Sequence, residues 1–423
     1  KQLEKSFAKS LLVARNMGPG TPVIKRLLAE LYNRLMRKNN IWTSQERIGG
    51  YQQRFEADAI SYINAYQADQ LSHLLQTRRK ALVTFHQALR ARSSKKQAEF
   101  FAETDFDVVL QAFPIWLVSV DDVNRILPFT KELFDLVIID EATQCDIASA
   151  LPALQRARRA VVVGDRKQLR HVSFLSNQKQ EELWKKSALE GKVSSGLSYR
   201  DQSLMDIASD AITSQSAVVL LDEHFRSKPE LIAFSNEFFY ANRLKIMQAR
   251  PGVNNGDALT FTKLSGKRLA SGRNAVEKDH IITVISQHIS DYAAIRIKPS
   301  LGVLSPYREQ AEYLDREIRK HFPAATLSDF NLRISTPYGF QGEERDVMLI
   351  SMAIDNESLR AASYLNREDM FNVAITRAKT QQRVVYSIDE ARLPSQNLFK
   401  RYLMHTESVR SAPSRQQALC DFS

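Results

Sequence analysis

Two acidic residues at the end of an apolar run are the sharpest chemical signal in the sequence. The run begins at Phe134 and ends at Asp140 and Glu141. It predicts a buried strand, and ligands of parallel sheets bind at the carboxyl ends of the strands. There Asp140 could hold Mg2+ through water, while Glu141 orients or deprotonates an attacking water. A solvated strand end, where paired acids are common, is the alternative interpretation.

A second apolar run ends at Gly164 and Asp165, and Gln168 follows. Gly164 permits a tight exit from the strand. Gln168 then lies beside the acidic pair, where it could sense a terminal phosphate. A lone Gly-Asp turn would indicate nothing. Its position directly after a strand that neighbours the acidic one favours the functional interpretation.

Two arginines are candidates for stabilising the negative charge of a transferred phosphoryl group. Arg226 lies in the run His-Phe-Arg-Ser, directly after Phe225, and Arg377 lies in Asn-Val-Ala-Ile-Thr-Arg-Ala-Lys at the expected start of a helix. Planar, permanently charged guanidinium groups suit this task. An ordinary surface arginine is the alternative for both.

Two further apolar runs end in small hydroxyls, amides and aromatic rings. Ser305, Tyr307 and Gln310 follow one of them, and Thr336 follows the other, ahead of the run Gln-Gly-Glu-Glu-Arg-Asp that contains Glu344. At one sheet edge such groups could grip a phosphodiester backbone and stack on bases. Ordinary turn chemistry is the alternative.

The elements that must position these residues are short strands alternating with helices. From Phe106 onward this alternation predicts an α/β fold whose parallel sheets are covered on both faces. The expected strands are Phe134 to Asp140, Ala160 to Asp165, Val218 to Asp222, Leu259 to Leu264, Leu301 to Pro306, Leu332 to Thr336, Val347 to Met352 and Arg383 to Ser387.

Before Phe106 the patterns are helical. A heptad-like seam, interrupted by Arg78, suggests a helical hairpin or stalk. It consists of Leu71, Leu75, Leu82, Phe85 and Leu89. We therefore expect a helical insertion at 1–112, α/β domains at 113–213 and 214–405, and a polar tail at 406–423.

Composition favours a globular protein with a polyanionic partner. The 423 residues, 43% of them hydrophobic, suffice for two or three packed domains, and the net charge of +11 suits nucleic acid. No apolar run is long enough to cross a bilayer, and the N-terminal residues lack a signal-peptide core, so we expect a cytoplasmic protein with no membrane partner. Cys145 and Cys420 fit neither a disulfide framework nor a zinc site.

The order and spacing of the motifs resemble those of superfamily 1 helicases, in the branch of the nonsense-mediated-decay RNA helicase and its bacterial relatives. Asp-Glu-Ala-Thr-Gln resembles the Walker B motif of that family, and Gly-Asp-Arg-Lys-Gln-Leu resembles its third motif. The runs that contain Arg226, Glu344 and Arg377 resemble its fourth, fifth and sixth motifs. The resemblance covers roughly Phe113 to Tyr402.

This resemblance implies tandem RecA-like P-loop NTPase domains that use ATP and Mg2+. It assigns Mg2+ to Asp140, water activation to Glu141, and the gamma-phosphate to Gln168, Arg226 and Arg377. It also assigns nucleotide-binding positions to Phe225 on the base, Glu344 on the ribose, and Gly164 and Asp165 in the third motif. The positions that match the nucleic-acid track are Ser305, Tyr307, Gln310 and Thr336.

Two departures from the family pattern stand out. Arg166 occupies a position that is usually proline, which alters the stiffness of a turn. The phosphate-binding run GxxxxGK[ST] is absent, and its nearest counterpart, Gly18 to Lys25, has a proline in the loop and lacks the second glycine before the lysine. We therefore expect an incomplete first domain.

Two hypotheses follow for the function. The chain is a fragment of an ATP-dependent helicase and is itself inactive, or it is a nucleic-acid-binding or interaction module that no longer hydrolyses ATP. The expected partner is DNA or RNA, single-stranded, and the expected state is a monomer. The residues encoded upstream of Lys1 would discriminate between the two hypotheses.

Overall fold

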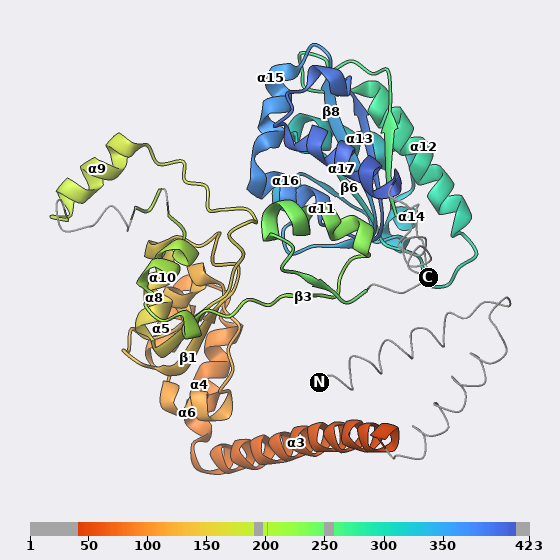
Figure 1. Ribbon diagram of the computed structural model, residues 1–423. Coiled ribbons are helices and arrows are strands. Elements are labelled where there is room, and N and C mark those ends of the chain that lie inside the picture. The colour runs from red at the N-terminus through yellow and green to blue at the C-terminus, as the bar shows by residue number, and fades with distance from the viewer. Residues whose placement is uncertain (1–40, 190–197, 201, 249–257, 412–423) are drawn as a thin grey trace. The chain divides into compact units, whose positions relative to one another are not determined.

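The computed structural model describes residues 41–189, 198–200, 202–248 and 258–411 of the chain (Figure 1). The chain divides into two compact units, 1–128 and 129–423. Within the described ranges, no helix is both long and apolar enough to cross a membrane. The run from Gly18 to Lys25 lies outside the described residues.

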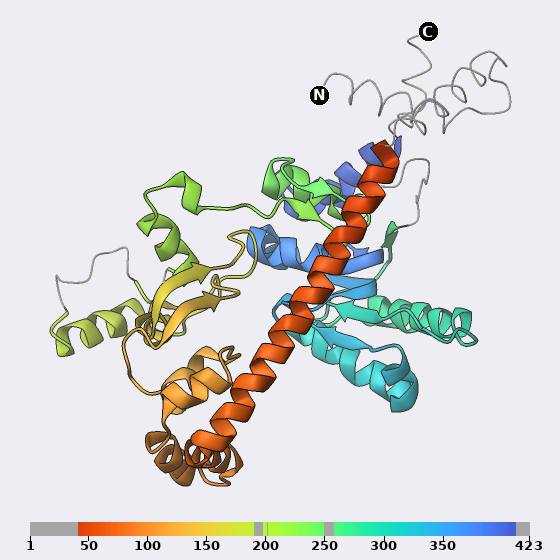
Figure 2. The ribbon, with the colours of Figure 1, turned by 90° about the horizontal axis from the view of Figure 1, so that it is seen from below.

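The described part of the first unit is helical, as the sequence predicts. Its helices are α3 (Ile41–Thr77), α4 (Arg79–Arg90), α5 (Ser94–Ala102), α6 (Phe106–Ala112), the 3-10 helix η1 (Val120–Asp122) and α7 (Val123–Ile126). Figure 2 shows α3 as one long rod. A small core surrounds Phe85, whose ring lies 5.7 to 6.3 Å, between centroids, from the rings of Phe101, Phe113 and Trp116.

The heptad-like seam is divided between two helices. Arg78, between α3 and α4, has a non-helical backbone with φ −131° and ψ 26°. Leu82 and Phe85 are buried, whereas Leu75 and Leu89 are 46% and 56% exposed. The residue that interrupts the apolar pattern therefore also interrupts the helix, and the seam does not form one buried stripe.

The second unit begins with a two-stranded parallel sheet. Strands β1 (Phe134–Ile139) and β2 (Ala157–Val162) are joined by α8 (Ile147–Gln155), and α9 (Asn177–Lys186) and α10 (Leu204–Ala211) follow. Ile139, Ala150 and Leu204 pack together in a small core. A helical connection between neighbouring parallel strands is the arrangement that the alternating pattern predicts.

A five-stranded parallel sheet in the order β5-β9-β8-β6-β7 forms the larger part of this unit. Its strands are β5 (Leu259–Lys263), β6 (Leu301–Leu304), β7 (Arg333–Ser335), β8 (Arg345–Asp355) and β9 (Ala378–Ser387). The helices around it are α11 (Pro229–Tyr240), α12 (Ala275–Asp291), α13 (Arg308–His321), α14 (Ala324–Asp329), α15 (Leu359–Ala362), α16 (Glu368–Ile375) and α17 (Leu398–Ser411). The remaining 3-10 helices are η3 (Gln215–Ala217), η4 (Pro337–Phe340), η5 (Ser363–Asn366) and η6 (Glu390–Arg392).

Helices cover both faces of the five-stranded sheet (Figure 1). On one face, α11 and α16 contribute Phe234 and Phe371 to the larger core. On the other face, α12 and α13 contribute Ile285 and Leu314 to a second core. Parallel sheets with helical layers, together with a helical N-terminal region, confirm the predicted α/β fold class.

The expected strand from Val218 to Asp222 was wrong. This segment lies outside any strand, and only the following residues, β3 (Glu223–His224), pair with β4 (Lys245–Ile246). Val219 and Leu221 are 78% and 81% exposed. The apolar composition suits a buried strand, but a strand forms only where a neighbouring backbone pairs with it. In this segment only the carbonyl of Asp222 accepts from a strand, at the N–H of Lys245 in β4, and no described strand pairs with Val218 to Leu221. Every other expected strand has a counterpart.

A buried carboxyl group ties α12 to the ends of two strands. Glu277 is fully buried, and its two oxygens accept hydrogen bonds of 2.7 to 3.0 Å from Asn274, Ser387, Ser351 and the N–H of Ala353. Ala353 has φ 46° at an irregularity in β8, so the carboxyl satisfies a backbone donor at that point. Burial outweighs these hydrogen bonds and raises the pKa of Glu277 to about 7.

We expect Glu277 to make folding less favourable as the pH rises toward neutrality. Its folded pKa of about 7 lies above the ordinary 4.5, so between these values the unfolded chain releases a proton that the folded chain retains. The free energy of unfolding should therefore fall by up to about 3 kcal/mol over that range. Urea unfolding at about pH 5 and about pH 7.5 checks this, because Glu277→Gln should lose that part of the pH dependence. Glu309→Gln, at an exposed position on α13, is the control. The same pH dependence in all three proteins would contradict the assignment.

Candidate functional site

Glu141 has an unusual backbone conformation at the end of β1. Its φ is 52°, which a non-glycine residue seldom adopts. The turn is held by the N–H of Glu141, which donates to Oδ1 of Asp140 at 2.9 Å, and by the N–H of Ala142, which donates to the carbonyl of Val163 at 2.9 Å. Both acids therefore follow a strand end, with Asp140 exposed and Glu141 half-buried.

Gly164 lets the ends of β1 and β2 approach each other. A Cβ atom at this position would lie 3.3 Å from the nitrogen of Thr143, which is tighter than most real contacts. Beyond it, Asp165 accepts hydrogen bonds from the N–H of Lys167 at 2.9 Å and from the side-chain amide of Gln168 at 3.1 Å. Gly164 and Asp165 therefore shape the loop that carries Gln168.

The expectation that the run containing Arg377 starts a helix was wrong, because this run ends α16 and leads into β9. Arg377 directly precedes β9 and is almost completely buried, with 2% exposure. Its Nε donates to the carbonyl of Val373 at 2.9 Å, and its Nη2 lies 3.5 Å from Oε1 of Gln168. Burial, and then the charge of nearby Arg226, lower the pKa of Arg377 to about 10, so the group remains protonated at pH 7. A poorly solvated cation beside a like charge favours an anion in this space.

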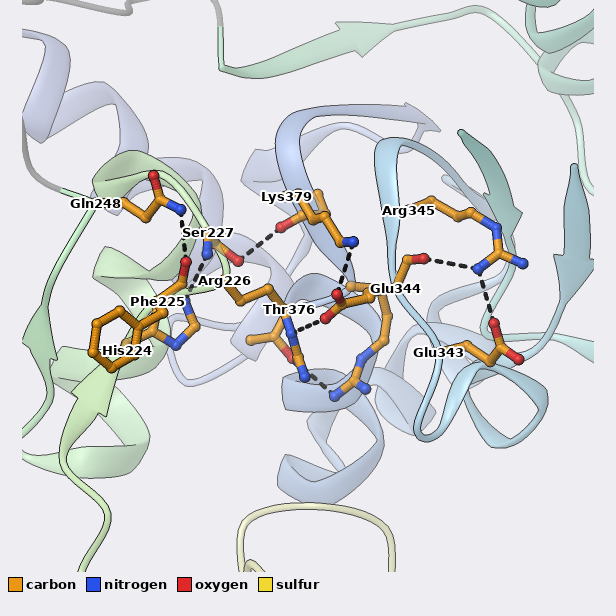
Figure 3. A network of polar contacts seen from close by, with 12 residues as sticks. His224, Phe225, Arg226, Ser227, Gln248, Glu343, Glu344, Arg345, Thr376 and Lys379 are labelled. Carbon is orange, nitrogen blue, oxygen red and sulfur yellow. Dashed lines mark hydrogen bonds and ion pairs between the residues drawn. The ribbon is translucent and has the colours of Figure 1, made fainter. Parts of the chain in front are cut away.

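Glu344 is shared by two cations, Arg226 and Lys379 (Figure 3). The Nζ atom of Lys379 lies 2.8 Å from the carboxylate. Burial opposes the ionisation of Glu344, but Lys379 and Arg226 outweigh it, and the pKa of the carboxyl lies below its usual range. Phe225, next to Arg226, is 61% exposed. An exposed ring beside this cationic group can stack on a base.

Local hydrogen bonds hold the turn that carries Arg226. His224 accepts from the N–H of Ser227 at 3.0 Å, and the hydroxyl of Ser227 donates to the carbonyl of Ala378 at 2.7 Å. Burial, and then the charge of Arg226, lower the pKa of His224 and keep the ring neutral as an acceptor. The turn is thereby attached to the first residue of β9, directly after Arg377.

Tyr240 and Asn372 join the loop after β2 to the helices beside the five-stranded sheet. The hydroxyl of Tyr240 donates to Asp165 at 2.6 Å and accepts from the amide of Asn372 at 2.9 Å. The same amide donates to the carbonyl of Lys167 at 2.9 Å. Burial, and then the charge of Asp165, raise the pKa of Tyr240, so its proton stays in this bond.

Gln341, like Tyr240 and Asn372, is a residue that sequence reasoning did not single out. Its amide donates to Oε2 of Glu141 at 3.1 Å. Gln341 and Asn372 both stand inside recognised motifs, and that position was the available signal. Tyr240 lies at the end of α11, and no pattern in the sequence distinguishes it.

The four nucleic-acid candidates differ in exposure. Ser305 and Gln310 are fully buried, Tyr307 is 9% exposed and Thr336 is half-buried. The amide of Gln310 bonds to Asn274 and the hydroxyl of Ser351 inside the protein. Ser305 and Gln310 therefore lie in the interior, behind the surface that Tyr307 and Thr336 reach.

A groove of about 640 Å3 lies beyond the carboxyl ends of β6 and β7. Tyr307 and Thr336 line it together with Arg308, Tyr338 and Tyr364. Tyr338 is 40% exposed. The acids Glu309, Glu312 and Asp315 line the groove as well, and Arg308 pairs with Glu312. The aromatic rings, hydroxyls and cation are groups that bind single-stranded nucleic acid, whereas the acids disfavour a polyanion.

The charges of the site fit a Mg2+-nucleotide complex in part. Asp140 offers an exposed carboxylate, and Mg2+ in nucleotide sites usually takes one or two carboxylates besides phosphates and water. The described residues contain no group of three or more His, Cys, Asp or Glu side chains that could hold a metal ion. Arg226, Arg377 and Lys379 supply positive charge for phosphate, but the sequence contains no GxxxxGK[ST] run to cradle it.

Two protein-family models, each described as an AAA domain, match this chain. One matches residues 65–174, and the other matches residues 200–389. An uncharacterized ATP-dependent helicase of Mycoplasma genitalium, MG140, is 27% identical over 310 residues, which are 67% of this chain and 26% of that protein. Helicase SEN1 of Saccharomyces cerevisiae is 28% identical over 263 residues, which are 58% of this chain and 11% of that protein. The probable helicase MAGATAMA 3 of Arabidopsis thaliana is 26% identical over 304 residues, with 67% and 34% covered. The chain matches about a third of these relatives' length or less.

The matched ranges contain the motifs on which the resemblance rests. The first range includes Asp140, Glu141 and Gln168, and the second includes Arg226 and Arg377 together with all five strands of the larger sheet. With the parallel sheets and the helicase relatives, these matches lead to one assignment. The chain belongs to the superfamily 1 helicases.

Proposed function

We propose that this chain is the motor part of an ATP-dependent helicase or translocase that acts on nucleic acid. The observation that carries the proposal is the convergence of catalytic candidates from the two sheets of the second unit. Glu141 bonds to Gln341, Gln168 lies against Arg377, and the charge of Arg226 acts on Arg377. A site for phosphoryl transfer between two RecA-like domains needs contributions of this kind from both.

The proposed catalytic roles follow from the chemistry of each side chain. Asp140 would hold Mg2+, and Glu141 would orient or deprotonate the attacking water. Gln168 would contact the gamma-phosphate. Arg226 and Arg377 would neutralise the charge that spreads over the transferred group. Bound Mg2+ would supply further neutralisation of the phosphate oxygens.

The proposed nucleotide contacts use residues beside this catalytic set. The exposed ring of Phe225 would stack on the base, and Glu344 would accept a hydrogen bond from the ribose. Glu344 is already fixed by two cations, which leaves its carboxylate ionised and suited to accept a further donor. Gly164 and Asp165 would act through the loop that positions Gln168.

The proposed nucleic-acid track is the groove beyond β6 and β7. Thr336 and Tyr338 would contact a single strand directly, with Tyr307 in the wall. Ser305 and Gln310 would keep that wall in place from within, because both are fully buried. The net charge of +11 favours a polyanion, and the proposal covers single strands of DNA and of RNA.

We further propose that the chain is divided into a helical insertion at 1–112, an incomplete α/β domain at 113–213, a second domain at 214–405 and a tail at 406–423. We also propose that the protein is a cytoplasmic monomer. The exposure of apolar side chains near β1 and β2 supports an incomplete first sheet. Ile138 is 63% exposed, Val161 is 45% exposed, and the segment from Val218 to Leu221 has no pairing strand among the described residues. A further strand that leads into a phosphate-binding loop would cover these groups.

A second candidate function is a nucleic-acid-binding or interaction module without ATP hydrolysis. The absence of a GxxxxGK[ST] run from the 423 residues favours it. The connected acids, amides and arginines favour the motor, because a binding module has no need of them.

We expect the chain as it stands to hydrolyse ATP at no meaningful rate and to dissolve poorly. Phosphoryl transfer depends on phosphates held in line, and the loop that supplies amides and a lysine for this is absent from the sequence. The test measures nucleic-acid-stimulated ATP hydrolysis for this chain and for a version extended upstream through a phosphate-binding loop. Equal, robust hydrolysis by both would refute the proposed need for that loop. Hydrolysis by neither would favour the binding module.

In the extended protein, Glu141→Gln should lower ATP turnover at least about 100-fold, because the amide cannot accept a proton from water. ATP binding should persist, since the shape is kept and the new side-chain oxygen can accept from Gln341. Steady-state hydrolysis and nucleotide binding are measured in parallel. Glu132→Gln changes an exposed glutamate nearby and should leave turnover unchanged. Parental turnover in Glu141→Gln would show that another residue is the base.

Binding of a fluorescent single strand should weaken steeply with salt, and Arg308→Gln should reduce the slope of log affinity against log salt by about 0.7, the contribution of one phosphate. Arg308 lines the groove and pairs with Glu312 four residues later. Arg319 pairs with Asp315 in the same helix but does not line the groove, so Arg319→Gln is the matched control. Fluorescence anisotropy at several salt concentrations gives the slopes. A slope that is the same in all three proteins would exclude Arg308 from the track.

A further inference from the structure

A cavity of about 420 Å3 lies between α12 and the outer strand of the five-stranded sheet. The residues that line it include Thr260 and Thr262 of β5, Arg383 of β9, Leu349 of β8, and His280 and Val284 of α12. None of them belongs to the candidate nucleotide site or to the groove beyond β6 and β7. The cavity is therefore a separate feature of the protein.

The alternation of side chains along β5 directs two hydroxyls into this cavity. Leu259 and Phe261 pack with the larger core on one face of the sheet, so Thr260 and Thr262 face the other side. Thr260 lies beside Arg383 in the strand register. Helix α12 packs on β8 and β9, and β5 lies beyond β9 at the edge of the sheet. The helix therefore leaves part of β5 uncovered.

Arg383 brings a positive charge that no carboxylate neutralises within the described residues. Its Nη2 donates to the side-chain oxygen of Gln381 at 3.2 Å, and that partner is a neutral amide. Burial, and then the charge of Arg383, lower the pKa of His280. Along the described chain, the hydroxyls of Thr260 and Thr262 make no hydrogen bond. The polar wall of the cavity thus offers a half-buried cation and two half-buried hydroxyls that a ligand could reach.

We propose that this cavity binds a small organic anion, a carboxylate or a phosphate monoester carried on an apolar body. Arg383 pairs with the anionic group, and the hydroxyls of Thr260 and Thr262 donate to it. Val284 and Leu349 pack against the apolar body. A bare phosphate would leave much of the space unfilled, whereas about 420 Å3 lies in the range of about 300–1,000 Å3 that is usual for small-molecule sites.

The test uses the full chain and ligand-observed NMR titrations with benzoate and phenyl phosphate as probes. Benzamide, which has the same ring without the charge, is the neutral control. Arg383→Gln removes the cation, and Thr260→Val removes one hydroxyl with little change of shape. Arg296→Gln removes a cation from an exposed position after α12 and is the matched control for charge. Thermal unfolding of each variant verifies the fold.

We expect at least one anion to bind, with affinity at least about tenfold lower in Arg383→Gln and measurably lower in Thr260→Val. Arg296→Gln should bind like the parent, and benzamide should bind at least about tenfold more weakly than benzoate. Tighter binding of phenyl phosphate would identify a phosphate monoester as the ligand class, and tighter binding of benzoate would identify a carboxylate. If Arg383→Gln does not fold, the proposal is still tested by the affinity of Thr260→Val for the anions and by the affinity of the parent protein for benzamide.

Three results would overturn the proposal. One is that neither anion binds to the folded chain. Another is that Arg296→Gln weakens binding as much as Arg383→Gln, since this would indicate a general attraction of anions to a basic surface. The third is displacement of the bound anion by a single-stranded oligonucleotide, which would show that the cavity belongs to a nucleic-acid surface.

Discussion

The hydroxyl of Tyr240 makes the contact on which the arrangement of the candidate site depends. It donates to Asp165 in the loop after β2 and accepts from Asn372 in α16. Leu169, at the end of that loop, is buried in the larger core of the five-stranded sheet. Polar groups in such a buried network are costly to leave unpaired, so the loop has one favoured position. Gln168, which lies between Asp165 and Leu169, is thereby held toward the start of β9.

The cations of the site differ in whether a carboxylate neutralises them. Arg226 and Lys379 share the carboxylate of Glu344, whereas Arg377 is buried without an ion pair among the described residues. A buried charge that lacks a counter-ion gains more from an anion than one that must leave its partner. In the proposed function, the phosphate would therefore be held chiefly by Arg377. Arg226 would bind the phosphate only to the extent that its ion pair with Glu344 breaks.

Local patterns in the sequence select candidate site residues, but they do not predict burial or distant partners. Asp140 and Glu141 could be recognised because an apolar strand and its terminal acids are adjacent in the chain, and the α/β class follows from the same alternation. Gln310 could not be placed, since an amide after a strand serves equally well inside the protein or at its surface. The partners of Tyr240 lie 75 and 132 residues away. The strand expected at 218–222 failed for the same reason, because pairing depends on a neighbour that composition does not reveal.

One short segment connects the groove with the carboxylate of Glu141. Thr336 and Tyr338 line the groove, and Gln341, three residues further on, donates to Glu141. Between them, Phe340 is fully buried in the larger core and is a fixed point of η4. A rotation of η4 about Phe340 that displaces Tyr338 would therefore also displace Gln341. A carboxylate that loses an amide donor becomes a stronger base. In the proposed function, a nucleic-acid strand that moves η4 would therefore change the basicity of Glu141. Binding of nucleic acid would affect ATP hydrolysis through this segment.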